Sequence, residues 1–159
     1  MSDKTYYLGA NAKLYLGTSG TSGDALVDMT VVGNIKDVKI DKTAGEADVT
    51  TRDSGGWREK APTLRECTIT FKMLFLAANT NVTAIRSAYL NGTQIRLAAL
   101  TDEKSSDGTT PAVGSEGVMG DFSITTCGRD EPLEEGVWYD VVAPLTKFKQ
   151  YIIDGIETP

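Results

Sequence analysis

The sequence predicts a mainly β fold, a β-sandwich or partly closed barrel with one α-helix packed on it. The first reason is residues 118–145, where apolar and polar side chains alternate along two runs separated by an acidic turn. The second is residues 64–75, the longest alternating run, and the third is a change to helical spacing at residues 79–91. Because side chains repeat every two residues in a strand and about every 3.6 in a helix, these segments predict a long hairpin, a long strand and one helix.

Shorter alternating runs are expected to complete the sheets. In chain order they are residues 12–16, 35–41, 46–52, 95–99 and 148–153. The second and third of these runs are joined through Lys42–Gly45, where glycine favours a break. Thr80 or Asn81 is expected to cap the start of the helix, and Asn91–Gly92 to close its end with a left-handed residue.

The chain of 159 residues is expected to form a single domain, residues 1–159. Residues 1–11 are expected to be a flexible N-terminal arm, and residues 154–159 a C-terminal tail. Residues 52–64 have no periodicity and contain a pair of glycines before Trp57. Loops of more than about 12 structureless residues are usually functional or disordered. Trp57 is therefore expected either to pack back on its own domain or to be presented to a partner.

Composition excludes several classes of protein. With 40% hydrophobic and 24% charged residues the chain has the balance of a globular protein. Its formal charge of −6 makes it poorly suited to bind the phosphate backbone of a nucleic acid, because such binding depends on Lys and Arg. The longest apolar run, Met73–Ala78, is far shorter than the roughly 20 residues that span a bilayer. Met1–Lys4 leads into polar sequence, so no signal peptide is expected.

The sequence shows none of the residue patterns that usually carry catalysis. The chain has no histidine, which removes the commonest general base and the usual zinc and copper ligands. Acidic residues in the hairpin turn are expected to be a solvated corner, and those in the 101–117 loop lack calcium-loop spacing. Cys67 is predicted to face the core and Cys127 the opposite side, which favours free thiols over a disulfide. We therefore expect no catalytic residues, no metal site and no cofactor.

The order of these segments resembles the major tail tube proteins of long-tailed, siphovirus-type bacteriophages. The resemblance begins with an early short strand at Ala12–Leu16 and continues through IKDVKID (35–41), EADVTTR (46–52) and a long loop. It then includes the alternating strand Thr68–Phe75, a single helix, and a closing hairpin with GDFSI (120–124) and EPLEEG (131–136). No single segment is specific to this family. The resemblance lies in the order of the segments along most of the chain.

The resemblance implies a structural subunit that closes into hexameric rings, which stack into a hollow tube through which DNA passes into the host without specific binding. It implies that the long loop reaches the neighbouring ring, so the expected contact residues are Arg52, Asp53, Ser54, Gly55, Gly56, Trp57, Arg58 and Glu59. The implied partners are further copies of the chain and the tape measure, tail-tip and tail terminator proteins, with no membrane. The implied location is the phage tail of the virion, after synthesis and assembly in the bacterial cytoplasm.

A lumen for DNA also gives the acidic composition a physical meaning. A wall of acidic and hydroxyl groups gains nothing from counterion release, so DNA would not adhere to it. The polar strand faces proposed for this wall are Thr68, Thr70, Asp121, Ser123 and Thr125. The alternative is that these side chains merely face solvent, and Lys72 on the same face as Thr70 departs from a purely anionic wall.

Two other classes of protein fit the same sequence features. A carbohydrate-binding β-sandwich module also needs no histidine and would place Trp57 and Trp138 on a sugar platform. The tube protein of a type VI secretion system resembles the phage tube in fold and stacking. An enzyme is the least expected class, because no arrangement of residues suggests a reaction.

Overall fold

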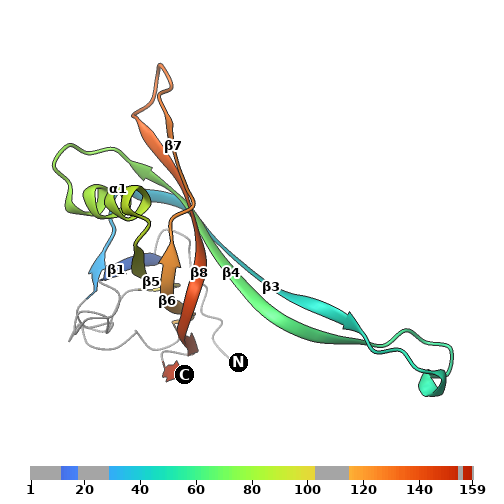
Figure 1. Ribbon diagram of the computed structural model, residues 1–159. Coiled ribbons are helices and arrows are strands. Elements are labelled where there is room, and N and C mark those ends of the chain that lie inside the picture. Colours follow the sequence, from blue (N-terminus) through green and yellow to red (C-terminus); the bar gives the residue numbers. More distant parts are fainter. Residues whose placement is uncertain (1–11, 18–28, 103–114, 154–155, 159) are drawn as a thin grey trace, which may run out of the picture.

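The structure is a computed structural model that describes residues 12–17, 29–102, 115–153 and 156–158. These residues contain nine strands and one α-helix, which Figure 1 labels. In chain order they are β1 (Lys13–Gly17), β2 (Thr30–Val31), β3 (Ile35–Asp48), β4 (Lys60–Leu74), α1 (Thr80–Asn91), β5 (Gln94–Leu100), β6 (Gly117–Ser123), β7 (Thr126–Asp130), β8 (Trp138–Ile153) and β9 (Ile156–Thr158). The expected mainly β fold with a single helix is confirmed.

The long strand β8 belongs to two sheets. Its first half pairs with β4 and β7, up to the pair of Pro144 with Thr68. Its second half pairs with β6 and β9, from the pair of Leu145 with Phe122 onward. We call β2-β1-β5-β6 with the second half of β8 and β9 the body sheet, and β3-β4 with the first half of β8 and β7 the arm sheet. All pairs are antiparallel, and the described strands run in an open order from β2 to β3.

The main core lies between the two sheets and the helix. Alternate residues of each strand face it, as the period of two predicts. From the body sheet it takes Leu14, Leu97, Val118 and Phe122, from the arm sheet Ile69, Phe71, Met73 and Val141, and from the helix Val82, Ile85 and Ala88. A smaller buried cluster covers the other face of the body sheet with Tyr15, Met29, Ala98, Leu100, Met119 and Ile152.

The helix begins and ends where the sequence predicts, with one difference in its capping residue. Asn79 is the N-cap, and its side-chain oxygen accepts hydrogen bonds from the amides of Asn81 (3.0 Å) and Val82 (3.2 Å). Neither Thr80 nor Asn81 fills that position, because both already lie inside the helix. Gly92 closes the helix with a φ of 65°, the left-handed conformation that glycine adopts without steric cost.

Replacing Asn79 by Ala is expected to lower the free energy of unfolding by about 1 kcal/mol, because two amides at the helix start lose their acceptor. For a chain of this length this corresponds to a fall of about 2–4 °C in the melting temperature. Thermal unfolding followed by circular dichroism measures it. Asn91→Ala is the matched control, since Asn91 is exposed at the last helical position. Equal melting temperatures for Asn79→Ala and the wild type would show that this cap does not stabilise the fold.

Two strands are longer than the sequence analysis predicts. β3 runs without a break from Ile35 to Asp48, although Lys42–Gly45 was expected to interrupt it. Gly45 lies opposite an irregularity in the ladder, where any Cβ would collide with Thr63 Oγ1. This glycine therefore makes room for the Thr63 side chain across the ladder, and it does not form a turn. β8 likewise runs through Pro144, so the strand expected at residues 148–153 is its continuation.

The strand boundaries next to the two hairpin turns also differ from expectation. β4 begins at Lys60, inside the segment 52–64 that was expected to be a loop. Gly128 lies in β7 and pairs with Asp140, so the turn of the long hairpin begins only after Asp130. A glycine does not end a strand when cross-strand pairing continues on both sides of it.

The two cysteines are free thiols. Cys67 is buried in the main core, as predicted. Cys127 is half-buried and packs against the same core, contrary to its predicted outward position, because the residues between β6 and β7 interrupt the regular alternation. Burial raises the pKa of both thiols, and nearby charges oppose the shift: Lys42 at Cys67 and Arg86 at Cys127. Both thiols are therefore protonated and weakly nucleophilic at neutral pH.

Candidate assembly surfaces

The outer parts of β3 and β4 form a hairpin that projects far from the rest of the protein (Figure 1). We call the stretch Asp41–Glu66 the arm. Every residue of the arm is described, and no side chain in it is buried. A two-stranded hairpin without a core is at best marginally stable in water. The arm therefore contributes little buried surface to its own domain.

The tip of the arm is nonetheless a defined structure. A 3-10 helix at Arg52–Ser54 is followed by Gly55 (φ 64°) and Gly56 (φ 86°), conformations that favour glycine. The Thr51 amide donates to Ser54 Oγ at 3.0 Å, and the Trp57 amide donates to the Ser54 carbonyl at 3.2 Å. The Trp57 side chain is 78% exposed. An apolar indole is thus held in solvent by a hydrogen-bonded turn.

Hydrogen bonds also close the hairpin just behind the tip. The Glu59 amide donates to Thr50 Oγ1 at 2.9 Å, and the Thr50 amide donates to Asp48 Oδ1 at 2.9 Å. The side-chain and backbone hydrogen bonds from Thr50 hold the pKa of the Asp48 carboxyl below its ordinary value. Lys60 Nζ lies 2.7 Å from Glu46 Oε2 across the two strands. These contacts keep the arm paired up to its tip.

An apolar hollow lies where the arm joins the body. We call it the root hollow; its volume is about 240 Å³, and it is lined by Cys67, Val118, Leu145, Phe148 and Tyr151, with Arg65 and Glu66 also at its edge. The rings of Phe148 and Tyr151 stack at a tilt with their centroids 4.7 Å apart. Phe148 remains 40% exposed, so the hollow offers aromatic surface to an incoming group.

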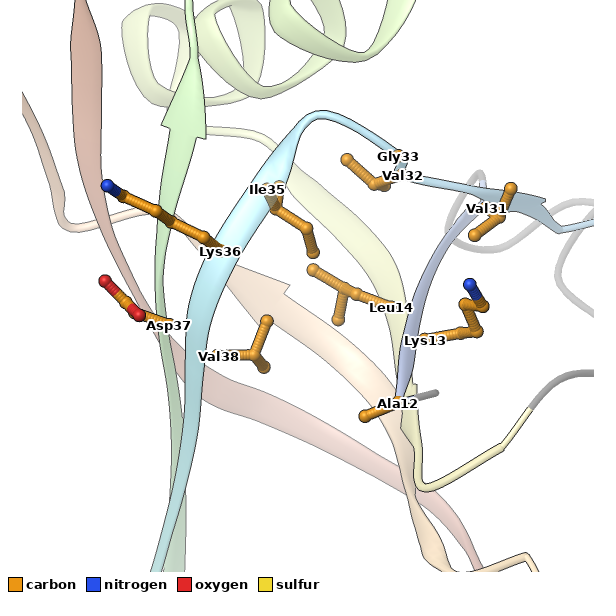
Figure 2. Close-up of a pocket in the computed structure, with 10 residues that line it drawn as sticks. All are labelled: Ala12, Lys13, Leu14, Val31, Val32, Gly33, Ile35, Lys36, Asp37 and Val38. Carbon is orange, nitrogen blue, oxygen red and sulfur yellow. The ribbon is translucent and has the colours of Figure 1, made fainter. Parts of the chain in front are cut away.

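A second, larger hollow lies between β1, β2 and the start of β3. Figure 2 shows the side chains of Leu14 and Ile35 on opposite walls of this space, with Val38 beside them. Its volume is about 510 Å³, and Lys13, Lys36 and Asp37 also contribute to its lining. In Figure 2 the side chains of Lys36 and Asp37 point away from Leu14, so their charged ends lie outside the hollow. The β3–β4 ladder is irregular between Lys36 and Lys39, and Asp37 has a φ of 54°. We call it the seam hollow.

The turn between β7 and β8 forms a second projection, which extends away from the body in Figure 1. Residues 131–136 are all exposed, and Leu133 is fully so. The carboxylates here are solvated as the sequence analysis expected, and Arg129 Nε lies 3.0 Å from Glu131 Oε1. Within the described part of the chain, no group of three or more His, Cys, Asp or Glu residues is placed to hold a metal ion.

The five residues proposed for a lumen do not share one surface of the single chain. Thr68 and Thr70 lie half-buried on the outward face of β4, beside Lys72, whose Nζ is 3.8 Å from Asp140 Oδ1. Thr125 is exposed, and the hydroxyl of half-buried Ser123 hydrogen-bonds that of Thr146 at 2.7 Å.

Asp121 is buried on the other face of the body sheet, where its Oδ1 lies 2.6 Å from Arg96 Nε. Arg96 was not predicted as a partner of Asp121, although a charged residue within the apolar run of β5 is a signal for a buried partner. The root hollow was not predicted either, because its lining residues come from β4, β6 and β8 and no local pattern unites them.

The two tryptophans lie in different environments. Trp57 is at the arm tip, whereas Trp138 is half-buried at the start of β8, with Lys36 Nζ 4.2 Å from its ring centroid. The arm separates them, so they do not form a common sugar-binding platform. Among the described residues, no helix is both long and apolar enough to cross a membrane.

Known proteins match this chain at the level of family and of fold. The sequence model of a family described as phage tail tube protein matches residues 10–141. The tail of an empty gene transfer agent particle, with C6 symmetry, is similar with a TM-score of 0.65 and 21% identity, covering 89% of this chain and 98% of that one. A native gene transfer agent virion matches with a TM-score of 0.64 and 19% identity over the same shares of the two chains.

The SPP1 tail tube is also similar, with a TM-score of 0.63 and 14% identity, covering 91% of this chain and 80% of that one. No curated protein sequence matches the chain. At these low identities the structural likeness establishes a shared fold, while the family match covers most of the sequence.

Proposed function

The chain belongs to the phage tail tube protein family, and on that premise we propose that it assembles into stacked hexameric rings around a lumen for DNA. It is a structural subunit of a tail tube. The C6 symmetry of the similar gene transfer agent tail supports six copies in each ring. The chain's place is then the tail of a virion, reached after synthesis and assembly in the cytoplasm of a bacterial host.

The observation that carries the stacking proposal is the arm. It buries none of its own side chains, it projects well beyond the body, and it ends in an ordered tip with an exposed indole. A surface of this kind gains free energy only by contact with another molecule, and aromatic residues with arginine are the usual anchors of such contacts. Residues Arg52–Glu59 are therefore proposed to contact the neighbouring ring.

The outward face of β4 is proposed to contribute to the lumen through Thr68 and Thr70. DNA passing a wall of hydroxyl and paired charged groups releases few counterions, so it is not held there. Lys72 faces the same way, and its proximity to Asp140 offsets its attraction for phosphate. Ser123 and Thr125 remain proposed lumen residues, and Asp121 is proposed only if its buried environment opens in the assembly.

The ends of such a tube need other proteins. We propose the tape measure protein inside the growing tube, and tail-tip and tail terminator proteins at its two ends. These partners follow from the family and from the need to begin and to stop an open-ended stack. The chain itself is proposed to have no catalytic role.

The first test is the assembly state of the purified chain. Light scattering over a concentration series is expected to show a rise in mass, and negative-stain microscopy is expected to show rings or tubes. Buffer-matched samples at the lowest concentration provide the baseline. A mass that stays at one chain up to the solubility limit, with no rings in the micrographs, would contradict self-assembly.

A further inference from the structure

We propose that the root hollow receives the Trp57 side chain from the arm tip of a second copy of this chain. The inference rests on the proposed function, in which the arm contacts another ring, and it names the receiving surface. Trp57 lies at the far end of the arm from the root hollow of its own chain. The occupant must therefore come from another copy.

The donor side is prepared for insertion. Trp57 is 78% exposed, and its backbone is held by the hydrogen bond to Ser54 and by the positive φ angles of Gly55 and Gly56. A group held in place before binding loses less conformational entropy when it is immobilised. Insertion would remove a large apolar surface from water, which is the main favourable contribution of an aromatic anchor.

The receiving side matches in size and chemistry. The root hollow is about 240 Å³, below the roughly 300–1,000 Å³ of pockets that bind small molecules, and therefore suits a single side chain. Its lining is mainly apolar, with the exposed edge of Phe148 available for an aromatic contact. The seam hollow is about twice as large, so a single indole would leave much of it unfilled, and it is therefore a poorer match.

The charges beside the two surfaces are complementary. Arg58 and Glu59 follow Trp57 in the tip, and Arg65 and Glu66 lie at the edge of the root hollow, all exposed. An inserted Trp57 therefore allows Arg58 to approach Glu66 and Glu59 to approach Arg65. Exposed pairs of this kind mainly set orientation and register.

The geometry also explains why the contact would repeat. Copies displaced along the direction of the arm bring the tip of one chain toward the arm root of the next. A contact between two different surfaces of the same chain does not close on itself when the copies are translated, so it extends a stack. The root hollow and Trp57 would thus form the axial joint of the tube.

Tryptophan fluorescence provides the first test. In the Trp138→Phe variant, Trp57 is the only tryptophan of the chain. Its emission is expected to move to shorter wavelength as tubes form, because the indole leaves water for the root hollow. Adding Phe148→Glu is expected to abolish both the shift and the tubes, while far-UV circular dichroism stays unchanged. Leu133→Glu, an equivalent change at an exposed apolar residue of the other turn, is the matched control and should assemble normally.

Disulfide trapping provides the second test. In a background of Cys67→Ser and Cys127→Ser, a chain with Arg58→Cys is mixed with a chain carrying Glu66→Cys and then oxidised, so that Trp57 and Phe148 are both retained. Covalent dimers are expected from this mixture. Replacing the second chain by one with Leu133→Cys should yield none.

Tubes that form while Trp57 emission stays that of an exposed indole, or that form normally with Phe148→Glu, would overturn this inference and leave the proposed function standing. The absence of any assembly by the wild type is a different result. It would remove the proposed function, and the inference with it.

Discussion

Deletion of Gly55–Arg58 is expected to abolish tube formation while the domain stays folded. The four residues lie beyond the last ladder pair, Asp48 with Lys60, so the strands of the arm keep their register. Their loss removes the exposed indole and the two glycines that shape the tip. Negative-stain microscopy should show no tubes at concentrations where the wild type forms them, and the melting temperature should stay within about 2 °C.

A variant of unchanged length separates the side chains from the reach of the arm. Trp57→Ser with Arg58→Ser keeps every backbone atom of the tip and removes its apolar and cationic groups. This variant is expected to behave like the deletion, because the free energy of the contact comes from the buried anchor. If the deletion variant forms normal tubes, the tip takes no part in stacking. If the double serine variant forms tubes and the deletion variant does not, the contact is made by the backbone of the tip and not by its side chains.

Replacement of Asp121 by Ala is expected to destabilise the fold strongly. Asp121 and Arg96 are buried on the body sheet with 2.6 Å between the carboxylate oxygen and Nε. Removing one partner of a buried ion pair leaves a charge in a poorly solvating environment and costs about 3–5 kcal/mol. The melting temperature should fall by on the order of 10 °C, which calorimetry of the unassembled chain at low concentration measures.

A double substitution provides the control for this pair. Arg96→Met with Asp121→Leu replaces both charges by apolar groups of similar size, and such replacements are often neutral or stabilising. The double variant is therefore expected to unfold at a higher temperature than Asp121→Ala. Additive losses in Arg96→Met and Asp121→Leu would show that the two residues are not energetically coupled.

The alternation of side chains was sufficient to predict much of the fold. The buried residues Cys67, Ile69, Phe71 and Met73 follow each other at the predicted spacing, and the helix ends at the predicted glycine. The first feature depends on side-chain periodicity and the second on the left-handed conformation of glycine, and both are local properties of the sequence. Strand continuity depends on the partner strands, and for this reason β3 through Gly45 and β8 through Pro144 were wrongly divided.

For the candidate assembly surfaces, too, local features could be predicted from the sequence, and features that depend on distant residues could not. The exposed tip around Trp57 was singled out from sequence because its lack of periodicity and its composition are local properties, and its role in stacking stays a prediction. The burial of Asp121 was not, since it depends on Arg96, which is 25 residues away and on a neighbouring strand. The role proposed for Thr68 and Thr70 stays a prediction, because it depends on where other copies of the chain lie.

The membership of β8 in both sheets has a mechanical consequence. Tension applied at the tip travels along β4 and crosses its hydrogen-bonded ladder into the first half of β8. From there it continues through the covalent backbone into the second half of β8, and reaches β6 by another ladder. Load is therefore carried from one sheet to the other by the covalent main chain of β8.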